Sequence, residues 1–312
     1  MPMSQSGQTI DAPERLEFGD IPPAGPASDT EKLVVATYNI RYAVGRGLIS
    51  SGILRKVGIN PPRQRRVAVS KNIETAARAF SAGTKLPRPD ILALQEADNA
   101  TGRAGGVHVA RELAAALGMS WVHAPAEIPR GVPPQAREWW LNFEEQIALH
   151  DEGDTGIALL SHLPLEDVTR IDLPWKECAW RPRLAMAATV VLGGHHVRIC
   201  NAHIDPHASL DGQHDQLEVV LADANQHHGP KIIRGDFNTL SRQKCVEIRA
   251  FMESQGYQTP FPTGTPTWRG AAIKLHADWI FVRDATITKW GVVRPLNVSD
   301  HWPIWAEVTL SK

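Results

Sequence analysis

Two short apolar runs, each bordered by a cluster of polar residues, constrain this chain more than any other feature of its sequence. Residues 231–233 predict a buried strand, and the turn that follows it projects Asp236 and Asn238 to one side. Asp300 and His301 immediately precede a second apolar run, which predicts a closing strand. A carboxylate and an amide beside an acid and an imidazole are the groups that metal-assisted hydrolysis of a phosphate ester needs.

Apolar runs alternate with amphipathic stretches along the chain, which favours an α/β fold. The chain has 312 residues, 43% of them hydrophobic, so it can bury a large core, and we predict one domain. Predicted strands span residues 33–40, 91–95, 157–161, 184–192, 197–203, 231–235, 278–282 and 303–310, and predicted helices span 63–80, 108–117 and 213–226. The Gly193-Gly194 turn predicts a hairpin, so the sheets are at least partly antiparallel.

Charge, cysteine content and hydropathy limit the binding partners and the cellular compartments that suit this chain. The formal net charge is -1, so no global basic field marks a nonspecific nucleic-acid binder. The three cysteines are scattered and odd in number, which favours a reducing compartment over a disulfide framework. Residues 1–32 lack the apolar stretch of a secretory signal, and no later run approaches the ~18 apolar residues of a membrane span. We therefore expect a cytoplasmic protein with no transmembrane segment and a flexible N-terminal arm over residues 1–32.

Several predicted strands end in a polar residue of the kind that a metal-phosphate site needs, although one such residue alone is usually a turn residue. Together they supply four carboxylates, two amides and two imidazoles, at Asn39, Glu96, His203, Asp236, Asn238, Asp278, Asp300 and His301. If these ends converge, the carboxylates repel one another unless a divalent cation lies among them. Because the set is rich in oxygen, it favours Mg²⁺ or Mn²⁺ over zinc.

Seven segments of the chain, in the same order, resemble the motifs of the endonuclease/exonuclease/phosphatase superfamily. They span residues 37–40, 94–96, 156–161, 201–205, 235–238, 277–282 and 299–301, within a matching region from residue 33 to residue 310. The resemblance implies a four-layer α/β-sandwich, in which two mixed β-sheets pack face to face with helices outside and the active site lies at one end. It also implies that residues 33–312 form the catalytic domain.

The resemblance further implies a role for each polar residue. Glu96 looks like the principal metal ligand, with Asn39 and Asp300 beside it. Asp236 looks like the residue that orients or deprotonates the attacking water, and Asn238 looks like a donor to the phosphate.

Two histidines complete this set. By the same resemblance, His301 would act as an acid or stabilise the phosphorane, with Asp278 holding its ring in one tautomer. His203 would be a second donor to the phosphate. In some relatives an acidic residue orients this second histidine, and Asp154 and Glu145 are only weak candidates for it here.

The segment from Arg41 to Lys71 carries eight Lys or Arg and no Asp or Glu. It predicts either a rim that attracts a polyanion or a solvated loop followed by the polar face of a helix. The candidate substrate-binding residues are Arg41, Trp180, Arg181 and Arg183, because guanidinium groups clamp phosphates and indole rings stack on bases. The alternative for the tryptophans is packing in the core.

The sequence leaves the substrate open. The leading hypothesis is a Mg²⁺-dependent phosphoesterase that cleaves a phosphodiester or phosphomonoester bond by in-line attack of water, with nucleic acid as one candidate substrate. The alternatives are a lipid or small-molecule phosphodiesterase similar to sphingomyelinases, or an inositol phosphatase. A non-catalytic binding module is disfavoured because Glu96, Asp236 and His301 are all present.

The residues after His203 allow one further interpretation, a zinc hydrolase cluster with His207 and His214. Pro206 interrupts this segment and no cysteine ligand accompanies it, so the usual spacings of zinc ligands are not matched. We therefore expect the metal at the ends of the predicted strands instead.

Overall fold

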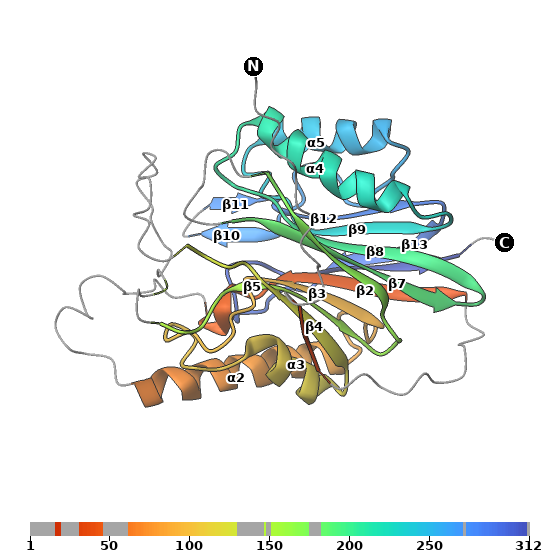
Figure 1. Ribbon diagram of the computed structural model, residues 1–312. Coiled ribbons are helices and arrows are strands. Elements are labelled where there is room, and N and C mark those ends of the chain that lie inside the picture. Colours follow the sequence, from red (N-terminus) through yellow and green to blue (C-terminus); the bar gives the residue numbers. More distant parts are fainter. Residues whose placement is uncertain are drawn as a thin grey trace, which may run out of the picture.

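The computed structural model describes residues 16–19, 31–45, 62–129, 147, 151–174, 182–270 and 273–310. Two β-sheets lie face to face, with helices α2 (Pro62–Ser81) and α3 (Val109–Leu117) outside one of them and α4 (Leu210–Asn225) and α5 (Arg242–Ser254) outside the other (Figure 1). This arrangement confirms the predicted four-layer α/β-sandwich. None of the described helices is long and apolar enough to cross a membrane.

The larger sheet has seven strands and is mixed. Its strands, in spatial order, are β1 (Glu17–Phe18), β4 (Ser120–Pro125), β5 (Gly156–Ser161), β3 (Ile91–Gln95), β2 (Lys32–Asn39), β14 (Ile304–Thr309) and β13 (Thr286–Val292). Strands β2 and β3 are parallel, and the other neighbours are antiparallel. Both faces of β3 and β5 are covered, which explains why these strands are continuous apolar runs.

The smaller sheet has five strands. In spatial order they are β12 (Asp278–Arg283), β9 (Lys231–Asp236), β8 (His195–His203), β7 (Leu184–Leu192) and β6 (Glu166–Asp172). The predicted hairpin is confirmed, because β7 and β8 pair antiparallel on either side of Gly193 and Gly194, which both have positive φ. A separate pair is formed by β10 (Trp268–Gly270) and β11 (Ile273–Leu275), and a short 3₁₀ helix, η2, spans Arg41–Ala43.

The three predicted helices are present, and α3 and α4 begin at residues whose side chains cap them. His108 caps the N-terminus of α3, and Gly118 ends it in the left-handed conformation with a φ of 66°. Ser209 caps α4 through the amide of Gly212, so this helix begins three residues before the predicted start. Ser241 caps α5 in the same way.

Helix α5 and strands β1, β4, β6, β10, β11 and β13 were not predicted from the sequence. The buried residues of α5, Cys245, Ile248 and Met252, do have helical spacing, but they are few. Strands β6 and β13 lie at sheet edges and leave most positions at least partly exposed, so their apolar alternation is weak.

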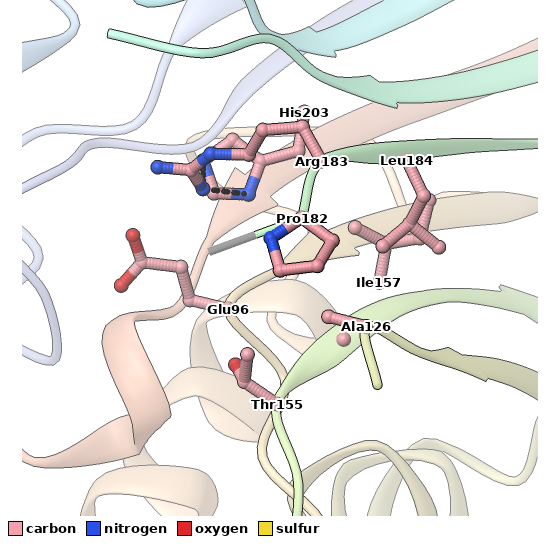
Figure 2. Close-up of a pocket in the computed structure, with 9 residues that line it drawn as sticks. Glu96, Ala126, Thr155, Ile157, Pro182, Arg183, Leu184 and His203 are labelled. Atoms are coloured by element: carbon pink, nitrogen blue, oxygen red, sulfur yellow. Dashed lines mark hydrogen bonds between the residues drawn. The ribbon is translucent and has the colours of Figure 1, made fainter. Parts of the chain in front are cut away.

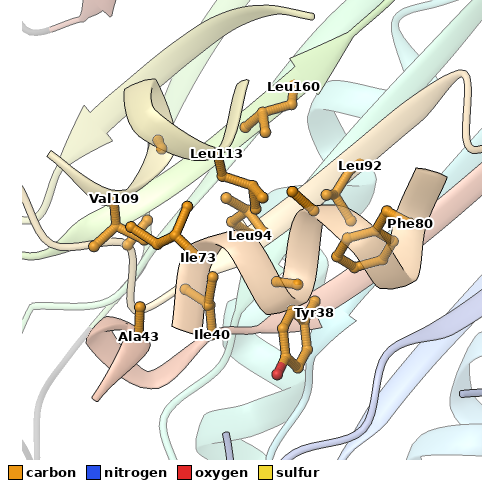
Figure 3. Packing of buried hydrophobic residues seen from close by; sticks show 14 of the residues in the cluster. Tyr38, Ile40, Ala43, Ile73, Phe80, Leu92, Leu94, Val109, Leu113 and Leu160 are labelled. Atoms are coloured by element: carbon orange, nitrogen blue, oxygen red, sulfur yellow. The ribbon is translucent and has the colours of Figure 1, made fainter. Parts of the chain in front are cut away.

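Apolar side chains fill the space between the layers. One cluster lies between the two sheets, and one lies under each pair of helices. Figure 3 shows the cluster under α2 and α3, where Ile73 and Phe80 of α2 and Leu113 of α3 meet Leu92 and Leu94 of β3. This packing fixes the strands, and with them the polar residues at their ends.

The residues predicted as an N-terminal arm are described at two places, residues 16–19 and the start of β2. Glu17 and Phe18 form strand β1, which pairs with His123 and Val122 of β4. This part of the arm is therefore attached to the larger sheet. The boundary at residue 32 stays a prediction.

Candidate active site

The polar residues predicted from the strand ends meet at one end of the sandwich. Asn39 ends β2 and Asp236 ends β9, and the Asn39 amide donates a hydrogen bond of 2.9 Å to the Asp236 carboxylate across the two sheets. Strands β12 and β14 run antiparallel to β9 and β2, so their first residues return to this end. Asp278 is thus in register with Asp236, and His301 lies just before β14.

The end of β9 and the turn that follows it have backbone conformations that restrict which residues fit there. Gly235 has a φ of 148°, and a Cβ atom there would lie 1.9 Å from the carbonyl oxygen of Ala202, so only glycine fits. Asn238 has a φ of 50°, which asparagine tolerates better than most residues. Its backbone amide donates to the Asp236 carboxylate at 2.9 Å, and its side-chain amide donates to the carbonyl of Ile204 at 2.9 Å. The turn therefore holds Asp236 in one orientation.

His301 and Asp278 form a buried pair. Nδ1 of His301 lies 2.9 Å from one carboxylate oxygen of Asp278 and 3.2 Å from the other. Thr267 holds the backbone at Asp278 in place, because its hydroxyl accepts hydrogen bonds from the backbone amides of Ala277 and Asp278. With Nδ1 directed at a carboxylate, Nε2 of His301 is directed at Asp236, 3.7 Å from its Oδ2 atom.

His203 approaches the same oxygen atom from the smaller sheet. Its Nε2 atom lies 3.6 Å from Oδ2 of Asp236. Both imidazole contacts are longer than a hydrogen bond, so the two rings flank one carboxylate oxygen without being bonded to it. Nη1 of Arg183 lies 2.9 Å from Nε2 and 3.0 Å from Nδ1 of His203. The guanidinium group of Arg183 therefore lies in direct contact with the His203 ring.

Burial and neighbouring charges shift the ionisation of this group. Burial raises the pKa of Asp236, although the charge of His301 opposes the shift. Burial alone would lower the pKa of His301, but the carboxylates of Asp278 and Asp236 outweigh it and raise the pKa. A carboxylate with a raised pKa beside a protonated imidazole is suited to proton transfer near neutral pH.

Asp300 has partners of its own, among them the hydroxyl of Ser299, which donates to its carboxylate at 3.2 Å. The indole Nε1 of Trp268 donates to its carboxylate at 3.0 Å, and Nη1 of Arg41 lies 3.7 Å away. Arg41 also donates from its backbone to the side-chain oxygen of Asn39 at 3.1 Å, which links the two predicted metal ligands. Trp268 is a site neighbour that the sequence reasoning missed, since β10 carried no motif.

Glu96 follows β3 with a φ of 52° and is 9% exposed. It lines a small pocket together with Arg183, His203 and Thr155, and the other walls are formed by Ala126, Gly156, Ile157, Pro182 and Leu184 (Figure 2). Figure 2 places Arg183 and His203 side by side on one wall, with the Glu96 carboxylate on another. The pocket thus joins two polar walls to an apolar one.

Among the residues that the structure describes, one group at this end is close enough together to hold a metal ion, and it consists of Asp236, Asp278 and His301. One ligand atom from each lies within 4.8 Å of the others. Glu96 and Asp300, predicted as metal ligands, lie outside this group. Their role in binding a metal stays a prediction, which rests on their position at the same end of the sandwich.

Some predicted residues lie outside the described part of the chain. They are Trp180, Arg181 and Glu145, together with residues 46–61 of the basic segment. Asp154, the other candidate partner of His203, accepts hydrogen bonds from the backbone amides of Glu127 and Thr155. The acid that would orient His203 is still unassigned.

The alternative zinc cluster is not supported by the geometry. His214 lies on α4, where its ring stacks on Phe251 of α5 at 4.5 Å between centroids. In the described ranges, no group of metal-ligating side chains combines His203 with His207 or His214.

A polar layer that the sequence analysis did not assign lies directly below the site. The amide of Gln95 donates to Asn201 at 2.6 Å and to Thr37 at 2.9 Å. Asn201 in turn donates to the carbonyls of Leu94 and Ala158, each at 2.9 Å. These bonds join β8 of one sheet to β3 and β5 of the other, so they set the separation of the two sheets where the active residues begin.

A sequence profile described as the Endonuclease/Exonuclease/phosphatase family matches residues 36–301. A UPF0294 protein of Yersinia enterocolitica is 28% identical over 131 residues, which cover 40% of this chain and 49% of that protein. The chain therefore spans about half the length of the curated relatives it matches.

Solved structures share the fold over most of this chain. An endonuclease/exonuclease/phosphatase from Beutenbergia cavernae aligns with a TM-score of 0.62 and 17% identity, covering 90% of this chain and 72% of that one. A mannosyl-6-phosphatase of Bacteroides thetaiotaomicron aligns with a TM-score of 0.58 and 14% identity, covering 89% of this chain and 100% of that one. At such identities the likeness shows the fold alone.

Proposed function

This chain belongs to the endonuclease/exonuclease/phosphatase family, and on that premise we propose that it is a divalent-metal-dependent phosphoesterase. It hydrolyses a phosphodiester or phosphomonoester bond by in-line attack of water, without a covalent intermediate. The observation that carries the proposal is the Asp236 carboxylate, which is buried and flanked by His301 at 3.7 Å and His203 at 3.6 Å. A candidate base thus lies beside two imidazoles that can donate hydrogen bonds to a phosphate.

Each residue of this group has a part in the proposed reaction. Asp236, held by Asn39 and by the backbone of Asn238, orients the attacking water and takes its proton. His301, kept in one tautomer by Asp278, donates a hydrogen bond or a proton to the phosphoryl group as its charge develops. His203 is the second donor to the phosphate.

The donor set fits Mg²⁺ or Mn²⁺. Glu96, Asn39 and Asp300 would hold the ion through oxygen atoms, which these hard cations prefer. Four carboxylates at one end of the sandwich, three of them buried, also favour a cation by charge alone. When bound, the ion supplies positive charge that polarises the phosphoryl oxygen.

The candidate substrates differ in what lies beside the phosphate. Arg183 at the pocket and Arg41 beside Asp300 are positioned to attract an anionic chain, which favours nucleic acid. The apolar wall of the pocket at Ile157, Pro182 and Leu184 instead favours a lipid or another small phosphoester with an apolar part. A cytoplasmic location remains a prediction, supported by the free buried thiols of Cys200 and Cys245.

The test is hydrolysis of bis-p-nitrophenyl phosphate and p-nitrophenyl phosphate with Mg²⁺, Mn²⁺ or EDTA, beside plasmid DNA, RNA and a sphingomyelin analogue. We expect turnover with metal, loss of turnover in Glu96→Gln, and normal turnover in Glu218→Gln, an exposed carboxylate of α4. The preferred compound separates the substrate classes, and undetectable binding of DNA and RNA at low salt would remove the nuclease alternative. If no compound is cleaved and neither cation raises the melting temperature, the proposed function is wrong.

A further inference from the structure

A second group of metal-compatible side chains lies at the edge of the larger sheet, apart from the active site. It consists of Glu17 of β1, His123 of β4 and His108 at the N-cap of α3, with one ligand atom from each within 4.8 Å of the others. Oε2 of Glu17 lies 3.0 Å from Nδ1 of His123 and 3.2 Å from Nε2 of His108. Three segments far apart in the sequence therefore present an oxygen and two nitrogens to one point.

These separations suit tetrahedral coordination. Two ligands that each lie 2.0 to 2.1 Å from a zinc ion at tetrahedral angles are about 3.3 Å apart, close to the 3.0 and 3.2 Å found around Glu17. Small adjustments of the Glu17 side chain would thus admit the ion. Two imidazoles and one carboxylate also form a donor set that zinc prefers over Mg²⁺.

The groups behind the ligands support this interpretation. Nε2 of His123 lies 2.8 Å from the carbonyl oxygen of Ala97, which fixes its proton on Nε2 and leaves Nδ1 to face Glu17. The amide of Asn99 donates to both carboxylate oxygens of Glu17, at 2.9 and 3.0 Å, and so orients the third ligand. Metal-binding histidines and carboxylates in proteins commonly have such partners.

His108 is the weaker of the two imidazole ligands. Its Nδ1 atom faces the backbone amide of Arg111 at a long 3.4 Å, and binding a metal through Nε2 would turn this contact into one between two N–H groups. Burial lowers the pKa of His108, which favours the neutral imidazole that a metal requires.

We propose that Glu17, His108 and His123 form a zinc-binding site that is separate from the catalytic one. Both histidines are buried, whereas the Glu17 side chain is 40% exposed, so an ion can enter from the Glu17 side and keep its fourth position for water. The ion would fasten β1 to β4 and to the start of α3. The site does not depend on the proposed function, because none of its ligands touches Asp236 or His301.

The experiment uses the full chain in a Glu96→Gln background with excess Mg²⁺, which keeps zinc out of the predicted catalytic site. Zinc retained after desalting and the melting temperature with and without zinc are measured, and Co²⁺ is added separately to record its visible spectrum. We expect about one zinc ion per chain, a melting temperature raised by several degrees, and the intense visible absorption of tetrahedral cobalt.

Glu17→Gln and His123→Gln should each lose the bound zinc and its stabilising effect, whereas His196→Gln, an exposed histidine of β8, should keep both. Glu17→Gln changes a partly exposed residue, so it tests the site even if His123→Gln fails to fold. Equal zinc content in the parent protein and in Glu17→Gln would overturn the proposal. Retention of no zinc by the parent protein would overturn it as well.

Discussion

The described part of the chain contains two places where a carboxylate lies between two imidazoles, and they differ in burial and spacing. Asp236 is 1% exposed and lies 3.6 and 3.7 Å from its two imidazole nitrogens, whereas Glu17 lies 3.0 and 3.2 Å from its own. Burial raises the pKa of Asp236, but hydrogen bonds from His108 and His123 lower the pKa of Glu17. The same kinds of group thus form an open, reactive arrangement in one place and a closed, hydrogen-bonded arrangement in the other.

The comparison shows that spacing, more than residue type, separates the two groups. At Asp236, Asn39 and the backbone of Asn238 donate to the carboxylate, and the two imidazoles lie beside it at distances longer than a hydrogen bond. At Glu17 the imidazoles themselves are the hydrogen-bond partners, so the group is saturated and suited to holding a structure together.

The largest loss of activity should follow a change of Asp236, the centre of the open group formed with His203 and His301. Asp236→Asn keeps the shape of the side chain and still allows a hydrogen bond from Asn39, but it removes the base. We therefore expect kcat/KM to fall by about 10²-fold or more. The measurement is steady-state hydrolysis of bis-p-nitrophenyl phosphate with saturating Mg²⁺. Glu17→Gln is the matched change in the closed group and should leave the rate unchanged; an equal loss in both variants would end the functional distinction between them.

A smaller effect should follow removal of the positioning carboxylate. Asp278→Asn leaves His301 in place but removes the charge that holds its ring and raises its pKa, so we expect a loss of about 10- to 100-fold in kcat. If His301 acts as an acid, the lower pKa also moves the alkaline limb of the pH–rate profile to lower pH. An unchanged pH profile together with a slower rate would assign Asp278 a purely structural role.

A third change tests whether the guanidinium beside His203 contacts substrate. Arg183→Gln should raise KM by about 10-fold with a smaller change in kcat, since a hydrogen bond from a charged donor to the phosphate is lost. Arg170→Gln removes a guanidinium group from β6 of the same sheet and is the control, in which KM should stay unchanged. A change in kcat alone would mean that Arg183 acts by positioning His203 and does not contact the substrate.

The two regions also differ in how far sequence reasoning could reach them. Asp236, Asp278 and His301 each adjoin a predicted strand, and the directions of neighbouring strands bring such ends together, so this group could be anticipated. The Glu17 group could not, because β1 has two residues, β4 was not predicted, and His108 serves as a helix cap.

Only some of the residues around the site could be anticipated from the sequence. Arg183 was predicted as a substrate-binding residue, and the predicted hairpin of β7 and β8 brings it beside His203. Trp268, in contrast, donates to Asp300 from a three-residue strand that carried no motif. Contacts of this kind depend on tertiary packing, which no local pattern encodes. Gly235, near the end of β9, is the opposite case, since its positive φ is a local backbone requirement that glycine meets.

The smallest predicted effect concerns the pH dependence of the closed group in the absence of metal. Because hydrogen bonds from His108 and His123 lower the pKa of Glu17 in the folded protein, the ionised carboxylate contributes stability above the unfolded value of about 4.3, and that contribution is lost as the pH falls below it. The Glu17 side chain is partly exposed, so the contribution should stay below about 1 kcal/mol. Urea unfolding of the wild type and Glu17→Gln in EDTA should therefore give free energies that differ near pH 7 and converge as the pH drops toward 3. A difference that persists unchanged at low pH would mean that Glu17 stabilises β1 through packing and its bonds to Asn99, and that its charge contributes nothing.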